Sequence, residues 1–343
     1  MRLPANSPFV KESRSVAQIM RYVLLALIPA VLLHVVFMGF GILIQFSLAA
    51  FVAIVLEIAI LRLRRKPWRD GIKDLSVLVL AALFTIAVPP YAPFWFTIAG
   101  VAFAVIVGKH IYGGIGGNLF NPAMAGYAFV LVSFPVVGTQ WPVLGGEADF
   151  IGPLGALIHI FAPQVSTDAI SGATVLDFSR TQAALMVMRS EMLGDAVFGR
   201  IAGRSWEWVN LAYLIGGLWL CFLRIISWRI AAGVIVGIAL PALIFSGLDP
   251  ELRAGALFHL FAGAAMPAAF FIATDPVSSP AAPRAMLAFG FGVGLLIYCI
   301  RVWGAYPDGV AFSVLIMNAL VPGLDRIFRP LPYGRRNTSN DVG

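Results

Sequence analysis

Charged residues are scarce in this chain of 343 residues: Lys, Arg, Asp and Glu make up 12% of it, whereas hydrophobic residues make up 60%. The charges gather between long apolar runs and do not alternate with apolar residues. A water-soluble globular domain is therefore excluded, and an all-α polytopic membrane protein is predicted. The net charge of +7 does not indicate nucleic-acid binding, because the basic residues lie in short connectors beside apolar segments.

Cysteine and histidine are also rare. The two cysteines, Cys221 and Cys299, lie inside predicted membrane spans, so this chain alone cannot ligate an iron–sulfur cluster and the thiols are expected to pack among apolar groups. The four histidines are His34, His110, His159 and His259. Their spacing is not typical of metal ligands, and no metal site is predicted.

Two further features are missing. No Gly-rich dinucleotide fingerprint follows a predicted strand, and no predicted soluble domain is large enough to bind a dinucleotide. No cleavable signal peptide is recognisable, because residues 1–21 are polar and basic and have no apolar core. The first apolar run is therefore expected to direct insertion into the membrane, and any redox catalysis is expected to belong to an assembly.

Apolar stretches of about 20 residues predict ten transmembrane helices in two groups of five. The first group is 21–38, 42–63, 75–89, 94–107 and 121–137, and the second is 206–226, 230–248, 255–273, 285–302 and 310–321. The chain is thus divided into a tail (1–20), a first repeat (21–137), a long loop (138–205), a second repeat (206–321) and a second tail (322–343).

The distribution of basic residues predicts the orientation of these spans. Most of the 24 Lys and Arg residues fall in the two tails, in the cluster at 62–73 and in connectors on that same side of the membrane. The positive-inside rule then places both tails in the cytoplasm and the loop 138–205 on the outer face of the membrane.

An odd number of spans in each half makes the second half start from the opposite side of the membrane, which predicts an inverted repeat. Connectors at corresponding places agree: Asn-Leu-Phe-Asn-Pro-Ala at 118–123 and Thr-Asp-Pro-Val-Ser-Ser-Pro at 274–280. Polar, Pro-containing breaks at matching places indicate a binding site between the two halves. The alternative is that both are ordinary Pro-containing helix ends.

The long loop contains Asp-Ala-Ile-Ser-Gly-Ala-Thr at 168–174. Thr174 and Asp177 have the spacing of a capping box and predict a helix that starts at Thr174 and runs to Met188. A helix start favours bound phosphate, and Gly172 and Ala173 leave room around a hydroxyl that could be esterified through a flavin phosphate. The alternative is that Thr174 only caps the helix.

Three stretches together resemble one family of membrane proteins: Ser-Gly-Ala-Thr at 171–174, Asn-Pro-Ala-Met at 121–124 and the connector at 274–280. They are similar to the D subunits of Rnf electron-transport complexes and the related B subunits of sodium-translocating NADH:quinone oxidoreductases. The resemblance covers nearly the whole chain, and the short tail before Arg21 resembles the Rnf members more closely.

The resemblance implies that FMN is joined to Thr174 by a phosphoester. It further implies a flavin transferase that recognises Asp168, Ser171, Gly172 and Ala173. It also implies a fold similar to urea transporters, with two inverted five-helix repeats, and a complex that couples electron transfer between ferredoxin and NAD to sodium or proton translocation. The expected partners are a second covalent-flavin subunit, iron–sulfur subunits, other membrane subunits and the lipid bilayer.

The resemblance also implies a second, non-covalent riboflavin nearer the cytoplasm. Topology alone makes Asn121, Thr274 and Asp275 the candidates for holding it, because their connectors lie on the inner side and carry hydrogen-bonding groups.

Ionisable residues within predicted spans are further candidates, since a charge is costly in hydrocarbon. Glu57 is a candidate for a cation pathway; the alternative is a carboxylate near the inner interface that pairs with Arg64 or Lys66. Arg301 is interpreted as an interfacial anchor. Five tryptophans are interpreted as aromatic belts at span ends: Trp141, Trp206, Trp208, Trp228 and Trp303.

Two functional classes therefore compete. The first is an electron-carrying subunit of a membrane redox complex. The second is a channel or solute transporter without a redox role, which the inverted repeat and the water-channel letters Asn-Pro-Ala at 121–123 favour. The redox interpretation is preferred, because a transporter has no evident use for the stretch 171–174 and because the matching place at 275–277 reads Asp-Pro-Val.

Overall fold

The computed structural model describes residues 14–114, 116–142, 151–162, 170–306 and 308–328, and the part described is mostly helical. The first half contains α1 (Val16–Met38), α2 (Gly41–Leu63), α3 (Trp68–Lys73), α4 (Ser76–Thr85), α5 (Phe94–Phe103), the π-helix η1 (Ala104–His110), α6 (Pro122–Ser133) and α7 (Pro135–Gly138). The second half contains α11 (Trp206–Phe222), α12 (Trp228–Leu248), α13 (Ala256–Phe261), α14 (Ala265–Pro267), the π-helix η2 (Ala268–Ile272), α15 (Pro283–Trp303) and α16 (Val310–Ile327).

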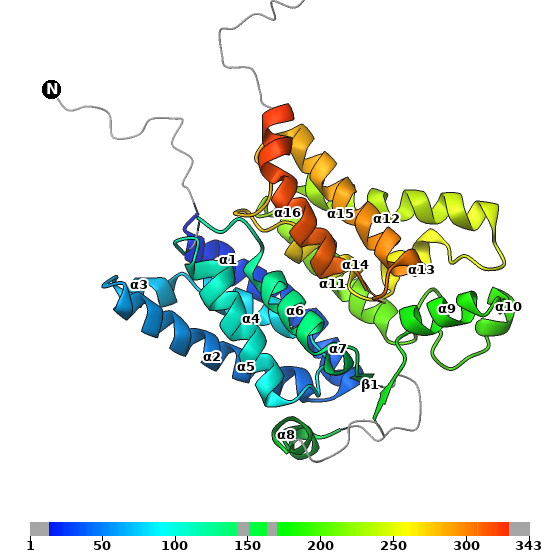
Figure 1. Ribbon diagram of the computed structural model, residues 1–343, viewed down its shortest axis with the longest axis horizontal. Helices are drawn as coiled ribbons and strands as arrows, with labels where there is room; N and C mark the ends of the chain where they lie inside the picture. Colours follow the sequence, from blue (N-terminus) through cyan, green and yellow to red (C-terminus); the bar gives the residue numbers. More distant parts are fainter. Residues whose placement is uncertain (1–13, 115, 143–150, 163–169, 307, 329–343) are drawn as a thin grey trace, which may run out of the picture.

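The loop between the halves has small elements of its own. They are β1 (Trp141–Pro142), α8 (Pro153–Phe161), β2 (Ser171–Gly172), α9 (Val175–Ala184) and α10 (Arg189–Met192). In Figure 1 the helices α1 to α7 form one group and α11 to α16 a second group beside it. The helix α8 lies at the bottom of this view, and α9 and α10 lie at its right.

Five helices are long and apolar enough to cross a membrane: α1, α2, α12, α15 and α16. Shorter apolar helices fill the predicted spans in between, and every predicted span contains helix. The structure therefore confirms an all-α polytopic membrane protein. The count of ten spans and the inverted repeat stay predictions.

Three predicted spans differ from the structure. The span predicted at 75–89 is helical only over α4, and the span predicted at 121–137 is interrupted between α6 and α7. The span predicted at 255–273 is broken into α13, α14 and η2. Gly263 lies at this break with a φ of 58°, a left-handed conformation that an α-helix cannot contain. Apolar composition alone did not reveal the break, since the residues on both sides of Gly263 are apolar.

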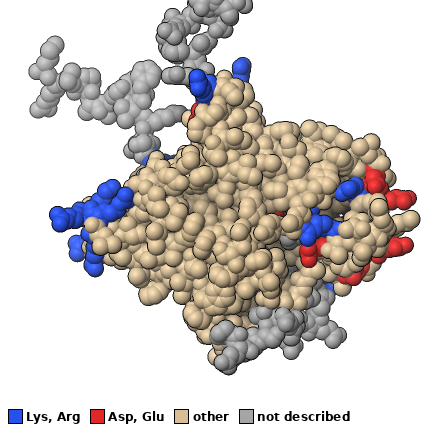
Figure 2. All heavy atoms as spheres, viewed as in Figure 1, with Lys and Arg blue, Asp and Glu red and all other residues tan. Residues whose placement is uncertain are grey.

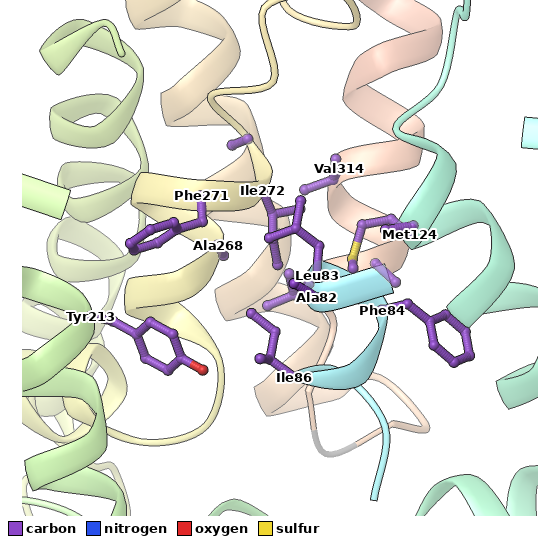
Figure 3. Close-up of a cluster of buried hydrophobic side chains, with 14 of the residues drawn as sticks. Ala82, Leu83, Phe84, Ile86, Met124, Tyr213, Ala268, Phe271, Ile272 and Val314 are labelled. Carbon is purple, nitrogen blue, oxygen red and sulfur yellow. The ribbon is translucent and has the colours of Figure 1, made fainter. Parts of the chain in front are cut away.

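The core lies where the two groups of helices meet. Figure 3 shows Leu83 and Ile86 of the α4 region and Met124 of α6 pointing toward Ile272 of η2 and Val314 of α16. These side chains all belong to one buried cluster or pack against it. The helices α1 and α11 also pack against each other, as do α6 and α16, so the two halves share one core.

Most charged side chains on the face shown in Figure 2 lie near its edges. Lys and Arg side chains gather around α3 at one end, a mixture of basic and acidic side chains lies at the opposite end around α9 and α10, and a few basic side chains lie at the top near the end of α16. The surface between these ends is almost free of charge in this view, as expected of a surface that faces lipid or partner helices.

The helices α12 and α15 approach each other through glycines on both sides. A Cβ atom added at Gly294 would lie 2.9 Å from the Cα of Gly237 and 2.9 Å from the backbone nitrogen of Ile238. Gly233 and Gly290 face each other in the same way. Small residues allow this backbone contact, which is a main source of attraction between helices in lipid.

The substitution Gly294→Val should therefore destabilise the protein by about 1–3 kcal/mol, because the added methyl groups overlap backbone atoms that cannot move aside. The measurement is unfolding of the detergent-solubilised protein in sodium dodecyl sulfate, followed by circular dichroism. Gly247→Val in α12 is the matched control, since a Cβ atom at Gly247 meets nothing within 4 Å. Equal losses in both variants would contradict the proposed contact.

Candidate functional site

The strands β1 and β2 fix the loop segment that leads into α9. They pair antiparallel, with Trp141 opposite Gly172 and Pro142 opposite Ser171. This short ladder holds the Ser-Gly-Ala-Thr stretch beside the segment that follows α7. Ala173 is exposed and Thr174 is half-buried, so a large reagent can approach the Thr174 hydroxyl from the outside. Asp168 lies outside the described residues.

Thr174 is the N-cap of α9. Its backbone is extended, and its Oγ1 accepts a hydrogen bond from the Asp177 N–H at 3.2 Å. The helix is shorter than predicted, because it ends at Ala184 and not at Met188. Met186 adopts a left-handed φ of 59°, and the Val187 N–H bonds back to the Gln182 carbonyl at 3.0 Å, a geometry that terminates helices.

Arg180 fastens α9 to the rest of the protein. Its Nη1 donates to the carbonyl of Gly304, just after α15, at 3.1 Å, and its Nη2 lies 3.3 Å from Asp177 Oδ1. Val175 and Leu176 of the same helix are buried. The N-terminus of α9, with its unpaired N–H groups and positive dipole end, is thereby held in a fixed position.

Thr174 opens onto a pocket between the two halves of the protein. The pocket holds about 820 Å³ of atom-free space, counted to its open mouth. Its walls come from the ends of α4, α6, α9, α11 and α16 and from the break between α13 and α14. The lining is mostly apolar, with aromatic side chains from Tyr127, Trp141, Trp206 and Tyr306.

Two tryptophans form one wall of this pocket. Trp141 and Trp206 meet edge to face with their ring centroids 5.4 Å apart, and Trp206 is only 7% exposed. The interpretation of Trp206 as a member of an aromatic belt was therefore wrong, whereas that of the half-buried Trp141 stays a prediction. Trp208, Trp228 and Trp303 are exposed, as that interpretation requires.

An ion pair between a buried arginine and a half-buried aspartate contributes Asp308 to the pocket wall. Arg301 is 3% exposed, and its Nη2 lies 3.2 Å from Asp308 Oδ2. Asp308 Oδ2 also accepts a hydrogen bond from the Ala264 N–H at 2.7 Å, and Arg301 donates to the carbonyls of His259 and Ala262. Arg301 is thus not an interfacial anchor. It holds the broken segment after α13 in place.

Asn210 of α11 completes this support. Its Nδ2 donates to the carbonyls of Trp206, Phe261 and Gly263 at 2.9–3.0 Å. Its Oδ1 accepts the Met266 N–H at 3.3 Å. Asn210 is completely buried. Neither Asn210 nor Asp308 was among the predicted site residues, although each is a polar residue within or beside a predicted span.

The two predicted connectors do meet in the structure. Asn121, the N-cap of α6, donates from Nδ2 to the Ile272 carbonyl at 3.1 Å. Asn318 of α16 accepts the Asn121 N–H at 3.0 Å and donates to the Ser278 carbonyl at 2.9 Å. Asn318 was missed in the sequence, and the signal that could have found it is an amide inside an apolar helix.

The other two candidates for the inner site bond within their own segment. Thr274 donates to the Phe270 carbonyl at 2.6 Å. Asp275 Oδ2 accepts from Ser278 Oγ at 2.8 Å. Burial raises the pKa of Asp275, and the bond from Ser278 opposes that shift. Asn121, Thr274 and Asp275 therefore already have protein partners, and a second flavin beside them stays a prediction.

Glu57 has other partners than those weighed from the sequence. Its Oε1 lies 2.9 Å from Lys109 Nζ, and its Oε2 lies 2.9 Å from His110 Nε2. Lys109 also donates to Ser76 Oγ at 3.1 Å. The side chains of Glu57, Lys109 and His110 are all at least 95% buried. Pairing with Arg64 or Lys66 was therefore wrong, and a role in a cation pathway stays a prediction.

Among the described residues, no three His, Cys, Asp or Glu side chains lie close enough together to hold a metal ion. The pocket at Thr174 is the place where an attachable hydroxyl, a helix N-terminus and aromatic walls coincide.

A sequence model of the NQR2, RnfD, RnfE family matches residues 4–334. The chain belongs to this family. The resemblance drawn from the three short stretches is confirmed.

Two relatives in the family share most of their length with this chain. A protein of Shewanella denitrificans is 42% identical over 344 residues, which cover 97% of this chain and 98% of the relative. A protein of Pseudomonas aeruginosa is 43% identical over 339 residues, which cover 98% of this chain and 97% of the relative. Both relatives are named as the D subunit of an ion-translocating oxidoreductase complex.

The contact between the two connectors can be tested at Asn318. Asn318→Leu leaves the Asn121 N–H and the Ser278 carbonyl without their partner, which should cost about 2–4 kcal/mol in the free energy of unfolding. Ser313→Ala in the same helix is the control, because Ser313 is buried and its hydroxyl has no partner among the described residues. An Asn318→Leu protein as stable as the control would show that these bonds contribute nothing.

The buried pair of Glu57 and Lys109 leads to a prediction about charge pairing and stability. Glu57→Gln leaves the Lys109 ammonium group buried without its counter-ion and should cost about 3–5 kcal/mol. The double variant Glu57→Gln/Lys109→Met removes both charges and should recover most of that loss. Unfolding of the two single variants and the double variant in sodium dodecyl sulfate measures this difference. Losses that simply add would contradict a direct ion pair.

Proposed function

We propose that this chain is a flavoprotein subunit of an Rnf-type complex, and that it carries electrons through FMN joined to Thr174 by a phosphoester. The observation that carries the proposal is the position of Thr174: it caps α9 at the mouth of the pocket lined by four aromatic residues. The family and the names of the relatives support the same class of function.

The residues around Thr174 suit such a cofactor. A phosphate on the Thr174 hydroxyl would lie at the N-terminus of α9, where free N–H groups and the helix dipole favour negative charge. The mostly apolar walls of the pocket, with a few polar groups among them, are typical of cofactor pockets. Trp141 and Trp206 offer ring faces and edges for contact with a flat aromatic group.

Each side chain then has a definite task. Trp206, Met124 and Tyr127 exclude water from the pocket. The Arg301–Asp308 pair fixes the Ala264 N–H at the pocket wall. When bound, FMN supplies the capacity to accept and donate one or two electrons, which no group of the described chain provides.

The proposal extends to the whole assembly. The complex would couple electron transfer between ferredoxin and NAD to sodium or proton translocation across a bacterial inner membrane, with the flavin loop on the periplasmic face and both tails in the cytoplasm. Partners would be a second covalent-flavin subunit on that face, iron–sulfur subunits, other membrane subunits and a flavin transferase during maturation. A riboflavin near Asn121, Thr274 and Asp275 and an ion pathway at Glu57 belong to the same proposal.

The decisive test is Thr174→Val in protein purified from a host that expresses an active flavin transferase. The variant should lose all covalently bound flavin, because valine keeps the shape of threonine but lacks its hydroxyl. In-gel fluorescence of the denatured chain and its intact mass measure the adduct. Removing the cap should cost only about 1 kcal/mol of stability, so the protein should still insert and fold.

Thr139→Val is the matched control, because Thr139 lines the same pocket and its hydroxyl bonds only to carbonyls of α7. It should keep a full FMN-sized adduct on the peptide that contains Thr174. An adduct retained in Thr174→Val would place the attachment elsewhere. An unmodified wild-type chain beside an active transferase would reduce Thr174 to a helix cap.

A further inference from the structure

A second pocket lies along α9. It holds about 1020 Å³ of atom-free space, counted to its open mouth, and is formed by α9, the connector 249–254, α13 and α15. Leu176 contributes to this pocket and to the pocket at Thr174. The proposed function makes no use of the second pocket.

Two buried polar groups in its wall lack a partner. The Tyr298 hydroxyl and His259 Nδ1 have no hydrogen-bond partner among the described residues, although Tyr298 is completely buried and His259 is 6% exposed. Both residues line the pocket, and their rings meet edge to face with centroids 5.0 Å apart. An unsatisfied buried hydroxyl is costly, so these groups indicate a bound ligand that supplies the missing partner.

The charged groups around the pocket define the sign of that ligand. Arg180, Arg253 and Arg301 all line it. Arg180 and Arg301 are paired with Asp177 and Asp308, whereas no ion pair or hydrogen bond joins the Arg253 guanidinium to the described part of the chain.

The one carboxylate among the lining residues does not neutralise this charge completely. Asp249 Oδ1 accepts the N–H of Leu252 at 3.2 Å and so stabilises the turn after α12. A fourth arginine, Arg189, lies close by, with its guanidinium 5.7 Å from the centre of the Phe258 ring. Hydrogen-bond donors and positive charge predominate, so the pocket suits an anion rich in oxygen.

The rest of the wall is apolar and lies at the edge of the membrane. Leu252, Phe258 and Val302 line the pocket beside the arginines. The helices α12 and α15, which are long enough to cross a membrane, both end here. Trp303 follows Val302 and is exposed, as tryptophans at the membrane interface commonly are. This is the level at which the phosphate groups of lipids lie.

We propose that this pocket binds the phosphate of an anionic phospholipid. Arg253 and the Tyr298 hydroxyl donate hydrogen bonds to the phosphate oxygens, and the apolar part of the wall receives the glycerol and the first carbons of an acyl chain. A phospholipid and free inorganic phosphate both carry the phosphate group that the arginine and the tyrosine would bind. Only the lipid also has apolar parts that can contact the apolar wall, so the wall favours the lipid.

The test is native mass spectrometry of the full-length chain in detergent, titrated separately with phosphatidylglycerol, phosphatidylcholine and inorganic phosphate. The wild type should retain phosphatidylglycerol in preference to phosphatidylcholine. Arg253→Gln should weaken that binding by about tenfold or more, since one charge-assisted hydrogen bond is lost. Tyr298→Phe should weaken it by about threefold to tenfold and leave the ring contacts unchanged.

Arg200→Gln is the control, because Arg200 is an exposed arginine of the same loop and does not line the pocket. It should bind phosphatidylglycerol as the wild type does. Thr174→Val should also bind it normally, so that failure of the flavin proposal and failure of this one are separable.

Three results would overturn the proposal. Equal retention of phosphatidylcholine would remove the role of anionic charge, and unchanged binding in both pocket variants would place the lipid elsewhere. Saturation by inorganic phosphate without any preference for the lipid would assign the pocket to the free anion.

Discussion

Backbone groups freed by a broken helix must find partners inside the protein, because the apolar interior of a membrane offers no water. In this chain the segment from α13 to the connector after η2 has many such groups. Side chains from four other places satisfy them: Asn210 of α11, Arg301 of α15 with Asp308, Asn121 before α6 and Asn318 of α16. The break at Gly263 therefore exists only together with these polar residues, and the pocket at Thr174 depends on both.

The same constraint explains why the functional features lie between the two halves. The pocket at Thr174 is walled by helices of both halves and by the start of α9. The contact of Asn121 with Asn318 ties the connector before α6 to the segment that follows η2. Each half supplies groups that the other half lacks, so neither the pocket at Thr174 nor the contact of Asn121 with Asn318 is complete within one half.

Much of this arrangement follows from the sequence. Long apolar runs predict the helices, because a helix needs about 20 apolar residues to span a membrane. The spacing of Thr174 and Asp177 predicts the start of α9. The break inside 255–273 could not be predicted, since the sequence does not show that Gly263 adopts a φ of 58°. The partners of Glu57 were missed for a similar reason. Lys109 and His110 lie in η1, a π-helix that packs against α2, and composition does not encode this packing.

Leu176 lines both pockets along α9, and its side chain forms the partition between them. It is also nearly completely buried, so its rotamer cannot change without displacing its neighbours. The leucine is therefore a fixed wall shared by the two pockets. A molecule seated on one side of it leaves the space on the other side unchanged, so the two pockets can be filled independently although they are neighbours.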